Sequence, residues 1–335
     1  RVINYMDEII AFVSILIDKG FAYVSEGDVY FRVTKSNNYA KLANKTLEDL
    51  EIGASGRTDA ETDRKEDPLD FALWKAAKEG EISWESPWGP GRPGWHIECS
   101  VMATEILGDT IDIHGGGADL EFPHHTNEIA QSEAKTGKTF ANYWMHNGFV
   151  NVDNEKMSKS LGNFVTVHDM LKTVDGQVLR FFLATQQYRK PINFTEKAIH
   201  DAEVNLKYLK NTHSLPLTEE VSQAELQAYL DAFQAAMDDD FNTANGVTVL
   251  FDMAKWINSG NYDETVKDAF EKILQVFGIV FEEETLDEDI EKLIEERQAA
   301  RANKDFATAD RIRDELAAQG IKLLDTKEGV RWTRD

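Results

Sequence analysis

Three side chains between residues 99 and 128 have the chemistry of zinc ligands. His124 and Glu128 are four residues apart, so a helix would place their imidazole and carboxylate on one face. Cys99, the only cysteine of the chain, lies upstream on another expected helix, and thiolate, imidazole and carboxylate groups all bind zinc. The alternative is an ordinary helix-surface pair beside a buried thiol. Four of the eight histidines lie between residues 96 and 125. Because of this clustering, the sequence supports a metal site and the helix-surface pair equally.

A polar loop with two lysines is expected over 153–163 and contains the sequence Lys-Met-Ser-Lys-Ser at 156–160. The ammonium groups of Lys156 and Lys159 could neutralise charge that develops on a leaving pyrophosphate, and a mobile loop would engage them mainly when that charge appears. Taken singly, most loops of this composition are solvated basic turns. The composition of this two-lysine loop (residues 156–160) therefore permits phosphate chemistry without requiring it.

The pattern of apolar residues places these side chains in an α/β arrangement. A helix is expected over 7–17, followed by a hairpin over 21–33 and a polar loop over 44–67. The run of prolines and glycines at 87–94 fits neither a helix nor a central strand, so it predicts a tight connector and a boundary. The elements after it alternate, as in a parallel sheet. They are a helix at 95–107, a strand at 110–114, a turn at 115–117 and a helix at 123–135.

The second half of the chain is expected to be mainly helical. Amphipathic patterns run over 166–211 and 222–277 and predict a helical bundle. The acidic segment at 282–297 keeps an apolar stripe at helical spacing, so it is interpreted as a solvated helix. The tail from residue 298 predicts two helices followed by a hairpin around 327–329.

Composition narrows the class of protein. With 335 residues the chain has room for two or three domains, and no apolar stretch is long enough to span a membrane. A net charge of −24 argues against general nucleic-acid affinity, so any RNA contact must use a local patch. The single cysteine fits a reducing compartment, and a cytoplasmic location is expected. Because residues 1–8 show neither an initiator methionine nor a signal peptide, the chain is expected to begin inside a longer protein.

Several motifs resemble those of one protein family. Lys-Met-Ser-Lys-Ser is similar to the signature loop of class I aminoacyl-tRNA synthetases, and other segments resemble the cysteinyl-tRNA synthetase family within that class. These segments are Gly-Trp-His-Ile-Glu-Cys-Ser at 94–100, His-Gly-Gly-Gly-Ala-Asp-Leu at 114–120, Phe-Pro-His-His-Thr-Asn-Glu-Ile-Ala-Gln at 122–131, Met-Asp-Asp-Asp-Phe-Asn-Thr at 237–243 and the tail at 301–332. The likeness covers essentially the whole chain.

The resemblance implies an α/β fold: part of a Rossmann-like class I catalytic domain with an inserted α+β unit, then a helical bundle and a small mixed α/β C-terminal domain. It also implies ATP-dependent activation of L-cysteine and its ligation to tRNA(Cys), by a monomer without membrane contact. The implied domains are an inserted segment at 1–90, the second half of the Rossmann-like fold with the cysteine pocket at 91–150, the two-lysine loop with a stem-contact segment at 151–198, a tRNA-binding helical bundle at 199–285 and an anticodon-binding domain at 286–335.

The resemblance also assigns roles in the amino-acid pocket. Cys99, His124 and Glu128 would be ligands of one zinc ion. A direct bond between zinc and the substrate thiolate would reject serine without a separate editing site. Asp119 would face the substrate ammonium group. The residues that would line the pocket or orient the ligands are Trp95, His96, His114, Asp119 and His125.

ATP would be bound through the two-lysine loop. Lys156, Ser158 and Lys159 would contact ATP and its Mg2+. Lys156 and Lys159 would be the catalytic pair that stabilises the triphosphate during adenylate formation, with Lys159 the stronger candidate.

In the tail, the resemblance implies an anticodon-binding role for Arg301, Phe306, Asp310 and Asp325. Their side chains would stack on or hydrogen-bond to single-stranded bases. The alternative is an ordinary amphipathic helix pair with a solvated face.

Two features of the family are missing from the sequence, namely a His-x-Gly-His element for nucleotide binding and a second cysteine as the remaining zinc ligand. The fourth ligand is therefore expected from a preceding segment, and these 335 residues alone are expected to be inactive. Three alternative functions stay open. A zinc-dependent hydrolase would leave the two-lysine loop idle, a ligase that joins cysteine to an amino sugar would lack the tail, and a tRNA-binding fragment would perform no catalysis.

Overall fold

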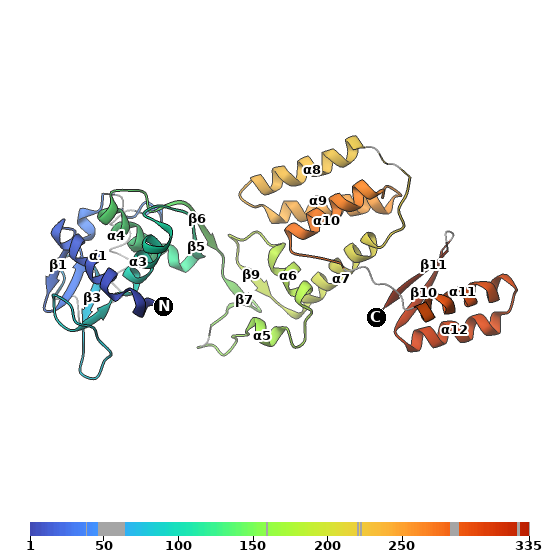
Figure 1. Ribbon diagram of the computed structural model, residues 1–335, viewed down its shortest axis with the longest axis horizontal. Helices are drawn as coiled ribbons and strands as arrows, with labels where there is room; N and C mark the ends of the chain where they lie inside the picture. The colour runs from blue at the N-terminus through green and yellow to red at the C-terminus, as the bar shows by residue number, and fades with distance from the viewer. Residues whose placement is uncertain are drawn as a thin grey trace. The chain divides into compact units, whose positions relative to one another are not determined.

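A computed structural model describes residues 1–37, 39–45, 64–158, 160–219, 221, 223–281, 288–326 and 329–334. The chain divides into two compact units, Arg1–Ile279 and Val280–Asp335 (Figure 1). Most of the loop expected at 44–67 lies outside the described residues. Among the helices that are described, none combines the length and the apolar character needed to cross a membrane.

An antiparallel sheet and a helix form the N-terminal α+β region. The elements of this region are, in sequence order, η1 (Val2–Tyr5), α1 (Met6–Asp18), β1 (Ala22–Ser25), β2 (Asp28–Phe31), η2 (Val33–Lys35), β3 (Phe71–Ala76) and β4 (Gly91–Pro93). The four strands lie in the sheet in the same order. Glu26 and Gly27 join β1 to β2 with φ angles of 51° and 87°, which suits a tight hairpin turn. The predicted helix and hairpin are confirmed. The predicted connector contains an edge strand, β4, where Pro93 is tolerated.

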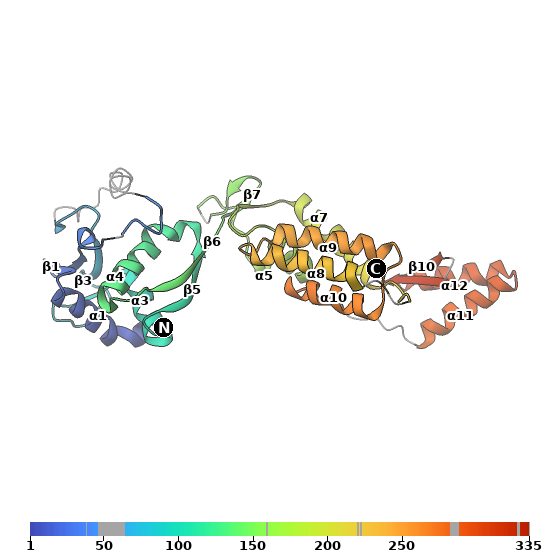
Figure 2. The ribbon, with the colours of Figure 1, turned by 90° about the horizontal axis from the view of Figure 1, so that it is seen from above.

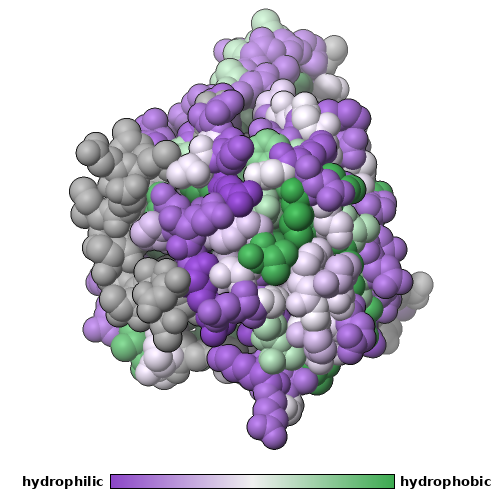
Figure 3. Space-filling view, turned by 90° about the vertical axis from the view of Figure 1, so that its left-hand side faces the viewer, coloured by the Kyte–Doolittle hydropathy of each residue, from purple (hydrophilic) through white to green (hydrophobic). Residues whose placement is uncertain are grey.

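One hydrophobic core joins this sheet to helices that follow it in sequence. Ile9 and Phe12 of α1 belong to the same buried cluster as Trp74 of β3 and Ile97 of α3 (Trp95–Leu107). The cluster therefore includes residues from both sides of residue 90. Figure 2 shows α1 and α3 close to α4 (Thr126–Thr136). The outer face of this region is largely hydrophilic and carries a small hydrophobic area (Figure 3).

A parallel βαβ unit follows α3, which ends at Gly108 with a φ of +93°. Strand β5 (Ile111–Gly117) pairs in parallel with β6 (Ala141–Asn147), and α4 connects them. The parallel pairing and the helix at 95–107 are as predicted. The sequence prediction was wrong about the glycine turn at 115–117, because these residues continue β5 and pair with β6.

The approach to α4 also differs from the prediction of one helix over 123–135. A 3₁₀ turn, η4 (Ala118–Leu120), and a π-helical turn, η5 (Glu121–His125), precede the regular helix, which begins at Thr126. Phe122 has extended φ and ψ angles of −137° and 131°. The residue before a proline is pushed out of the helical region, so Pro123 delays the start of the helix.

A small three-stranded sheet, in the order β8-β7-β9, supports the start of the two-lysine loop. Strand β7 (Val150–Val152) pairs with β8 (Glu155–Lys156) through Asp153 and Asn154, whose φ angles are 49° and 69°. Part of the loop expected at 153–163 is therefore a hairpin. The elements that follow are α5 (Val167–Met170), α6 (Gly176–Ala184) and β9 (Ile192–Phe194), which pairs in parallel with β7.

A helical bundle completes the first unit, as predicted. It contains α7 (Glu196–His213), α8 (Gln223–Asp238), α9 (Thr243–Asn258) and α10 (Glu264–Val276) (Figure 1). The side chains of Asn242 and Asp263 accept backbone N–H groups at the starts of α9 and α10. Leu209, Leu250 and Phe270 are fully buried between the helices.

The second unit has two helices and a hairpin. These elements are α11 (Glu288–Ala302), α12 (Phe306–Ala318), β10 (Ile321–Thr326) and β11 (Gly329–Arg334). The hairpin is as predicted, but only one helix of the two expected after residue 298 begins there within the described residues, because the preceding helix continues to Ala302. Ile290 and Ile294 of α11 pack in one cluster with Ile312 and Leu316 of α12 and with Ile321. The acidic segment is thus helical from Glu288 onward because it has an apolar face to bury.

Candidate metal centre

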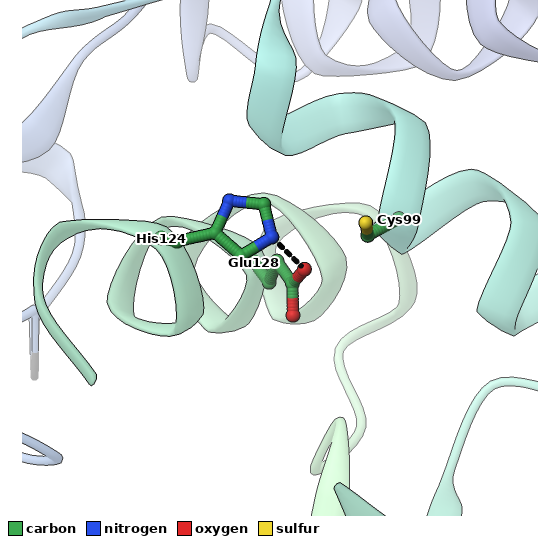
Figure 4. A group of neighbouring side chains, drawn as sticks. All are labelled: Cys99, His124 and Glu128. Carbon is green, nitrogen blue, oxygen red and sulfur yellow. Dashed lines mark ion pairs between the residues drawn. The ribbon is translucent and has the colours of Figure 1, made fainter. Parts of the chain in front are cut away.

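Three different elements bring the predicted metal ligands together. Cys99 lies on α3, His124 in η5 and Glu128 on α4. One donor atom from each residue lies within 4.8 Å of the donor atoms of the other two (Figure 4). His124 and Glu128 are buried, whereas Cys99 is partly exposed. The structure therefore assembles the thiol, the imidazole and the carboxylate that the sequence predicts.

Glu128 is the centre of this arrangement. Its side chain is fully buried, and Oε2 lies 2.5 Å from His114 Nε2. Burial by itself raises the pKa of Glu128, but the contacts with His114 and His124 outweigh burial and hold the pKa at about 2. Glu128 is therefore an anion at neutral pH, ready to bind a cation.

The second carboxylate oxygen is placed for a metal. Glu128 Oε1 lies 2.8 Å from His124 Nε2, yet it is buried and makes no hydrogen bond of good geometry within the described residues. A buried carboxylate oxygen whose one close partner, His124, is poorly aligned for a hydrogen bond is not fully satisfied, and a bound cation would satisfy it. This incompletely satisfied oxygen supports a metal at this position.

Cys99 is protonated in the metal-free chain. Burial, followed by the neighbouring negative charge of Glu128, raises the pKa of the Cys99 thiol to about 12. A coordinated cation reverses this balance, because a thiol bound to a divalent metal loses its proton. Thiol, imidazole and carboxylate are all zinc donors, and zinc bonds of about 2.0–2.3 Å require only a small approach of the three groups. The residues fit a zinc ion and leave a fourth position open.

Two further histidines lie beside the ligands, and one of them contacts a ligand directly. His96 Nδ1 lies 2.8 Å from His124 Nδ1, which leaves His124 Nε2 directed at Glu128. Burial and the proximity of His124 lower the pKa of His96 to about 4. Burial also lowers the pKa of His125 to about 4. Both imidazoles are therefore neutral at physiological pH, so they do not repel a cation.

The sequence analysis missed two residues of this site, Trp144 and His146 on β6. In the parallel register, Trp144 lies opposite His114 and His146 lies opposite Gly116. His146 Nε2 is 2.8 Å from His125 Nδ1, and the Trp144 ring centroid is 4.8 Å from that of His114. An aromatic residue and a histidine two positions apart on one strand are the signal that could have identified them.

Gly116 explains why the glycine triplet belongs to the site. A Cβ atom at Gly116 would lie 2.9 Å from His125 Cε1 and 3.0 Å from Leu120 Cδ1. Since real Cβ atoms do not approach other atoms so closely, the absence of a side chain lets His125 pack directly on β5. The glycines thus serve close packing rather than a turn.

The other predicted pocket residues lie at the edge of the cluster. Trp95 is 62% exposed, and its ring centroid lies 4.7 Å from that of His124. Asp119 is exposed on η4, next to the end of β5. Trp95 therefore borders the metal ligands while most of its surface is open to solvent.

The two-lysine loop is held by a neighbouring aromatic ring and an amide. Lys156 is exposed and its Nζ lies 3.9 Å from the ring centroid of Phe149. Ser158 N donates to Asn163 Oδ1 at 2.9 Å, and Asn163 Nδ2 donates to Lys156 O at 3.3 Å. Lys159 lies outside the described residues. Neither Phe149 nor Asn163 was predicted, because no spacing rule links them to the lysines.

In the second unit, the predicted anticodon residues present mostly exposed side chains. Arg301 lies in the last turn of α11, and Phe306, which is 62% exposed, begins α12. Asp310 is exposed and pairs with Arg313 at 3.0 Å. Asp325 lies in β10, and its side chain is outside the described part of the chain.

Comparisons with known proteins agree along the whole chain. Residues 1–204 match a family model described as the class I (C) tRNA synthetase catalytic domain, residues 232–282 a DALR domain, and residues 283–332 the cysteinyl-tRNA ligase anticodon binding domain. The Mycobacterium tuberculosis methionyl-tRNA synthetase bound to methionyl-adenylate shares the fold, with a TM-score of 0.53 and 14% identity over 82% of this chain and 70% of that one.

Two curated relatives are much closer in sequence. Proteins named cysteine–tRNA ligase from Streptococcus agalactiae serotype V and from Streptococcus pyogenes serotype M6 are each 81% identical over 100% of this chain and 75% of their own length. Identity at this level, over every residue of the chain, establishes common descent. The chain belongs to the cysteine–tRNA ligase family of class I aminoacyl-tRNA synthetases.

Proposed function

We propose that the protein activates L-cysteine with ATP and transfers it to tRNA(Cys). The observation that carries this proposal is the cluster of Cys99, His124 and Glu128, whose donor atoms lie within 4.8 Å of one another in a chain of this family. A zinc-dependent hydrolase would use the same cluster but would leave the two-lysine loop without a purpose. An amino-sugar ligase would not need the anticodon binding domain that residues 283–332 match.

The metal centre would select the amino acid. Cys99, His124 and Glu128 would hold a zinc ion, and the ion when bound supplies a site that prefers a thiolate to a hydroxyl group. The chain's own contribution is to orient the ligands. His114 fixes one oxygen of Glu128 at 2.5 Å, and His96 fixes His124 at 2.8 Å.

The rest of the pocket would place the substrate. Trp95 offers an exposed ring face beside His124, and this face would cover the substrate side chain and exclude water. The exposed carboxylate of Asp119 would pair with the substrate ammonium group. Neutral His125 would pack between β5 and His146 and keep the floor of the pocket rigid.

The two-lysine loop would act on ATP. The carboxylate of cysteine attacks the α-phosphorus, so the protein contributes positioning and charge stabilisation rather than covalent chemistry. Lys156 and Lys159, with Ser158, would bind the triphosphate together with Mg2+. The Phe149 ring would hold Lys156 ready at the end of β8 until ATP draws the ammonium group away.

Transfer RNA would contact the helical bundle and the second unit. With a net charge of −24, the chain can offer RNA only local contacts. Exposed Phe306 and Arg301 near the junction of α11 and α12 are suited to stack on single-stranded bases. The proposed role of the remaining anticodon residues, Asp310 and Asp325, is to accept hydrogen bonds from those bases.

Cysteine-dependent exchange of labelled pyrophosphate into ATP tests the first half of the reaction. We expect the protein in its complete natural sequence to exchange pyrophosphate with cysteine, whereas the 335 residues alone should not. With serine the rate should be at least about 10³-fold lower, because a metal–thiolate contact discriminates more strongly than an apolar pocket. Charging of tRNA(Cys) tests the second half. If the protein exchanges pyrophosphate but transfers cysteine to an amino sugar, the ligase alternative is favoured. If the protein in its complete natural sequence binds tRNA but does not exchange pyrophosphate, a binding module is favoured.

A further inference from the structure

The turn between α8 and α9 is tied to the segment that precedes β9. Tyr188 donates its hydroxyl to Asp240 Oδ1 at 2.9 Å, and Arg189 Nε donates to Asp240 Oδ2 at 2.6 Å. Thr243 Oγ1 also donates to the carbonyl of Gln186 at 2.8 Å. Both oxygens of one carboxylate are therefore occupied by donors from adjacent residues, which fixes the carboxylate in position and orientation.

The backbone of this turn is strained. Asp240 and Phe241 have φ angles of 53° and 52°, in the left-handed region that side chains disfavour. Phe241 is 52% exposed, so burial of its ring offsets little of the strain. Strained residues persist where surrounding contacts over-determine them, often at functional sites. Here the contacts of Asp240 with Tyr188 and Arg189 are the ones that hold the turn.

The segment that holds Asp240 also touches the strand leading to the two-lysine loop. Gly148 N donates to Tyr188 O at 2.7 Å, and Ile192 N donates to Phe149 O at 2.8 Å. A Cβ atom at Gly148 would lie 2.3 Å from the carbonyl carbon of Lys190, so only glycine permits this approach. The two segments are thus packed backbone to backbone, without an intervening side chain.

From Gly148 the connection continues to Lys156. Phe149 immediately precedes β7 and carries the ring on which Lys156 Nζ rests at 3.9 Å. At the other end of the hairpin, Met157 N donates to Val150 O at 3.1 Å. A continuous series of short contacts therefore runs from Asp240 to the first lysine of the loop.

We propose that Asp240, held by Tyr188 and Arg189, is a positioning residue that sets the place of Lys156 during cysteine activation. The inference rests on the proposed function. An isolated pair of this exposure, 54% for Arg189 and 45% for Asp240, would be of little consequence. The two donors on one carboxylate, the strained turn and the close packing at Gly148 distinguish it from such a pair.

The test compares Asp240→Asn with the unaltered protein in its complete natural sequence. We expect the kcat of pyrophosphate exchange to fall about 10-fold or more, because small displacements of catalytic groups are costly. The KM for cysteine and the thermal midpoint should change little. Tyr188→Phe removes one hydrogen bond and keeps the ring, so it should also lower kcat. It replaces Asp240→Asn as the test variant if Asp240→Asn folds poorly. The matched control is Asp109→Asn, which breaks the exposed 2.7 Å pair with Lys138 elsewhere and should leave kcat unchanged.

A second comparison asks whether Asp240 acts through Lys156. In a Lys156→Gln background, Asp240→Asn should cause less than a twofold further loss of kcat, since residues that act as a unit are non-additive. A full 10-fold further loss, or an unchanged kcat in Asp240→Asn and Tyr188→Phe alike, would overturn the inference. Absence of exchange in the unaltered protein would instead overturn the proposed function, and this inference with it.

Discussion

His124 Nε2 lies 2.8 Å from Glu128 Oε1, although His124 belongs to a π-helical turn and Glu128 to the regular helix α4. The four-residue spacing predicts the proximity correctly even though the helix begins later than expected. A wider turn still brings side chains four apart onto one side of the chain. The pair then depends on α3 for its third partner, Cys99.

Glu128→Gln should weaken zinc binding by about 10- to 100-fold or more, because it removes the negative charge and replaces one of the two carboxylate oxygens with an amide group that cannot bind a cation. Competition with a chromophoric chelator measures the affinity. Glu105→Gln, on the surface of α3, is the matched control and should bind zinc normally. Equal affinity in Glu128→Gln and the unaltered protein would exclude Glu128 as a ligand.

Cys99 should react slowly with iodoacetamide in the metal-free protein. A pKa near 12, caused by burial and by Glu128, leaves little thiolate at pH 8. The higher intrinsic reactivity of such a thiolate compensates in part, so we expect alkylation about 10- to 100-fold slower than that of a free cysteine. Mass spectrometry over time gives the rate. A rate equal to that of free cysteine would show that the thiol is not shielded.

The metal-free protein should lose stability as the pH falls from 6.5 to 4. Burial lowers the pKa of His96 and His125 to about 4, whereas the unfolded imidazoles titrate near pH 6.5. Between these pH values the unfolded chain binds more protons than the folded chain does. Each imidazole therefore lowers the free energy of unfolding by up to about 1.4 kcal/mol for each pH unit of acidification. Above pH 6.5 this contribution to stability is complete. Glu128, with a pKa near 2, stays ionised throughout the range.

Urea unfolding at pH 7, 5.5 and 4.5 measures this dependence. His125→Gln should flatten it, because the glutamine side chain does not titrate. His200→Gln provides the control, since His200 is largely exposed and 71% of its side chain is accessible. Equal slopes for the two variants would show that burial of His125 does not couple protonation to folding.

The sequence predicts local elements well where periodicity and end signals agree. The helix at 95–107 matches α3 at both ends, because Gly94 and Gly108 bracket a continuous helical pattern. The hairpin around Glu26 and Gly27 follows from turn chemistry in the same way. Cys99, His124 and Glu128 converge as predicted, since a βαβ unit packs α4 against its neighbours.

What the sequence does not reveal depends on contacts between distant segments. The glycines at 115–117 look like a turn, but pairing with β6 and the close approach of His125 keep them in a strand. His146 joins the site only through the register of β5 and β6. Pro123 displaces the start of α4, an effect that helical periodicity alone does not predict.

Gly116→Ala should disturb the site directly. The added methyl group would lie 2.9 Å from His125 Cε1, so the ring or the strand must move. Overpacking of this kind costs about 1–3 kcal/mol, and we expect a lower thermal midpoint together with weaker zinc binding. Gly176→Ala is the control, because the nearest atom, Leu171 Cδ2, lies at an ordinary 3.5 Å. If Gly116→Ala keeps full stability and affinity, the close packing on His125 is not needed.

Phe306→Ala should weaken binding of tRNA(Cys) while leaving activation of cysteine intact. The ring is 62% exposed at the start of α12 and contributes little to the core of the second unit. Stacking of a base on an aromatic ring is worth about 1–3 kcal/mol, which corresponds to about a 5- to 150-fold loss of affinity. Filter binding measures the affinity, and tRNA-independent pyrophosphate exchange reports on activation.

A surface control separates stacking from a general loss of apolar area. Ile82→Ala removes a side chain that is 79% exposed in the N-terminal region and should not change tRNA binding. If Phe306→Ala binds tRNA(Cys) as well as Ile82→Ala does, the exposed ring of α12 is part of an ordinary helix surface. If pyrophosphate exchange and tRNA binding both fall in Phe306→Ala, the substitution has disturbed folding. In that case the conservative variant Phe306→Tyr is compared, and normal tRNA binding by it would identify the ring itself as the contact.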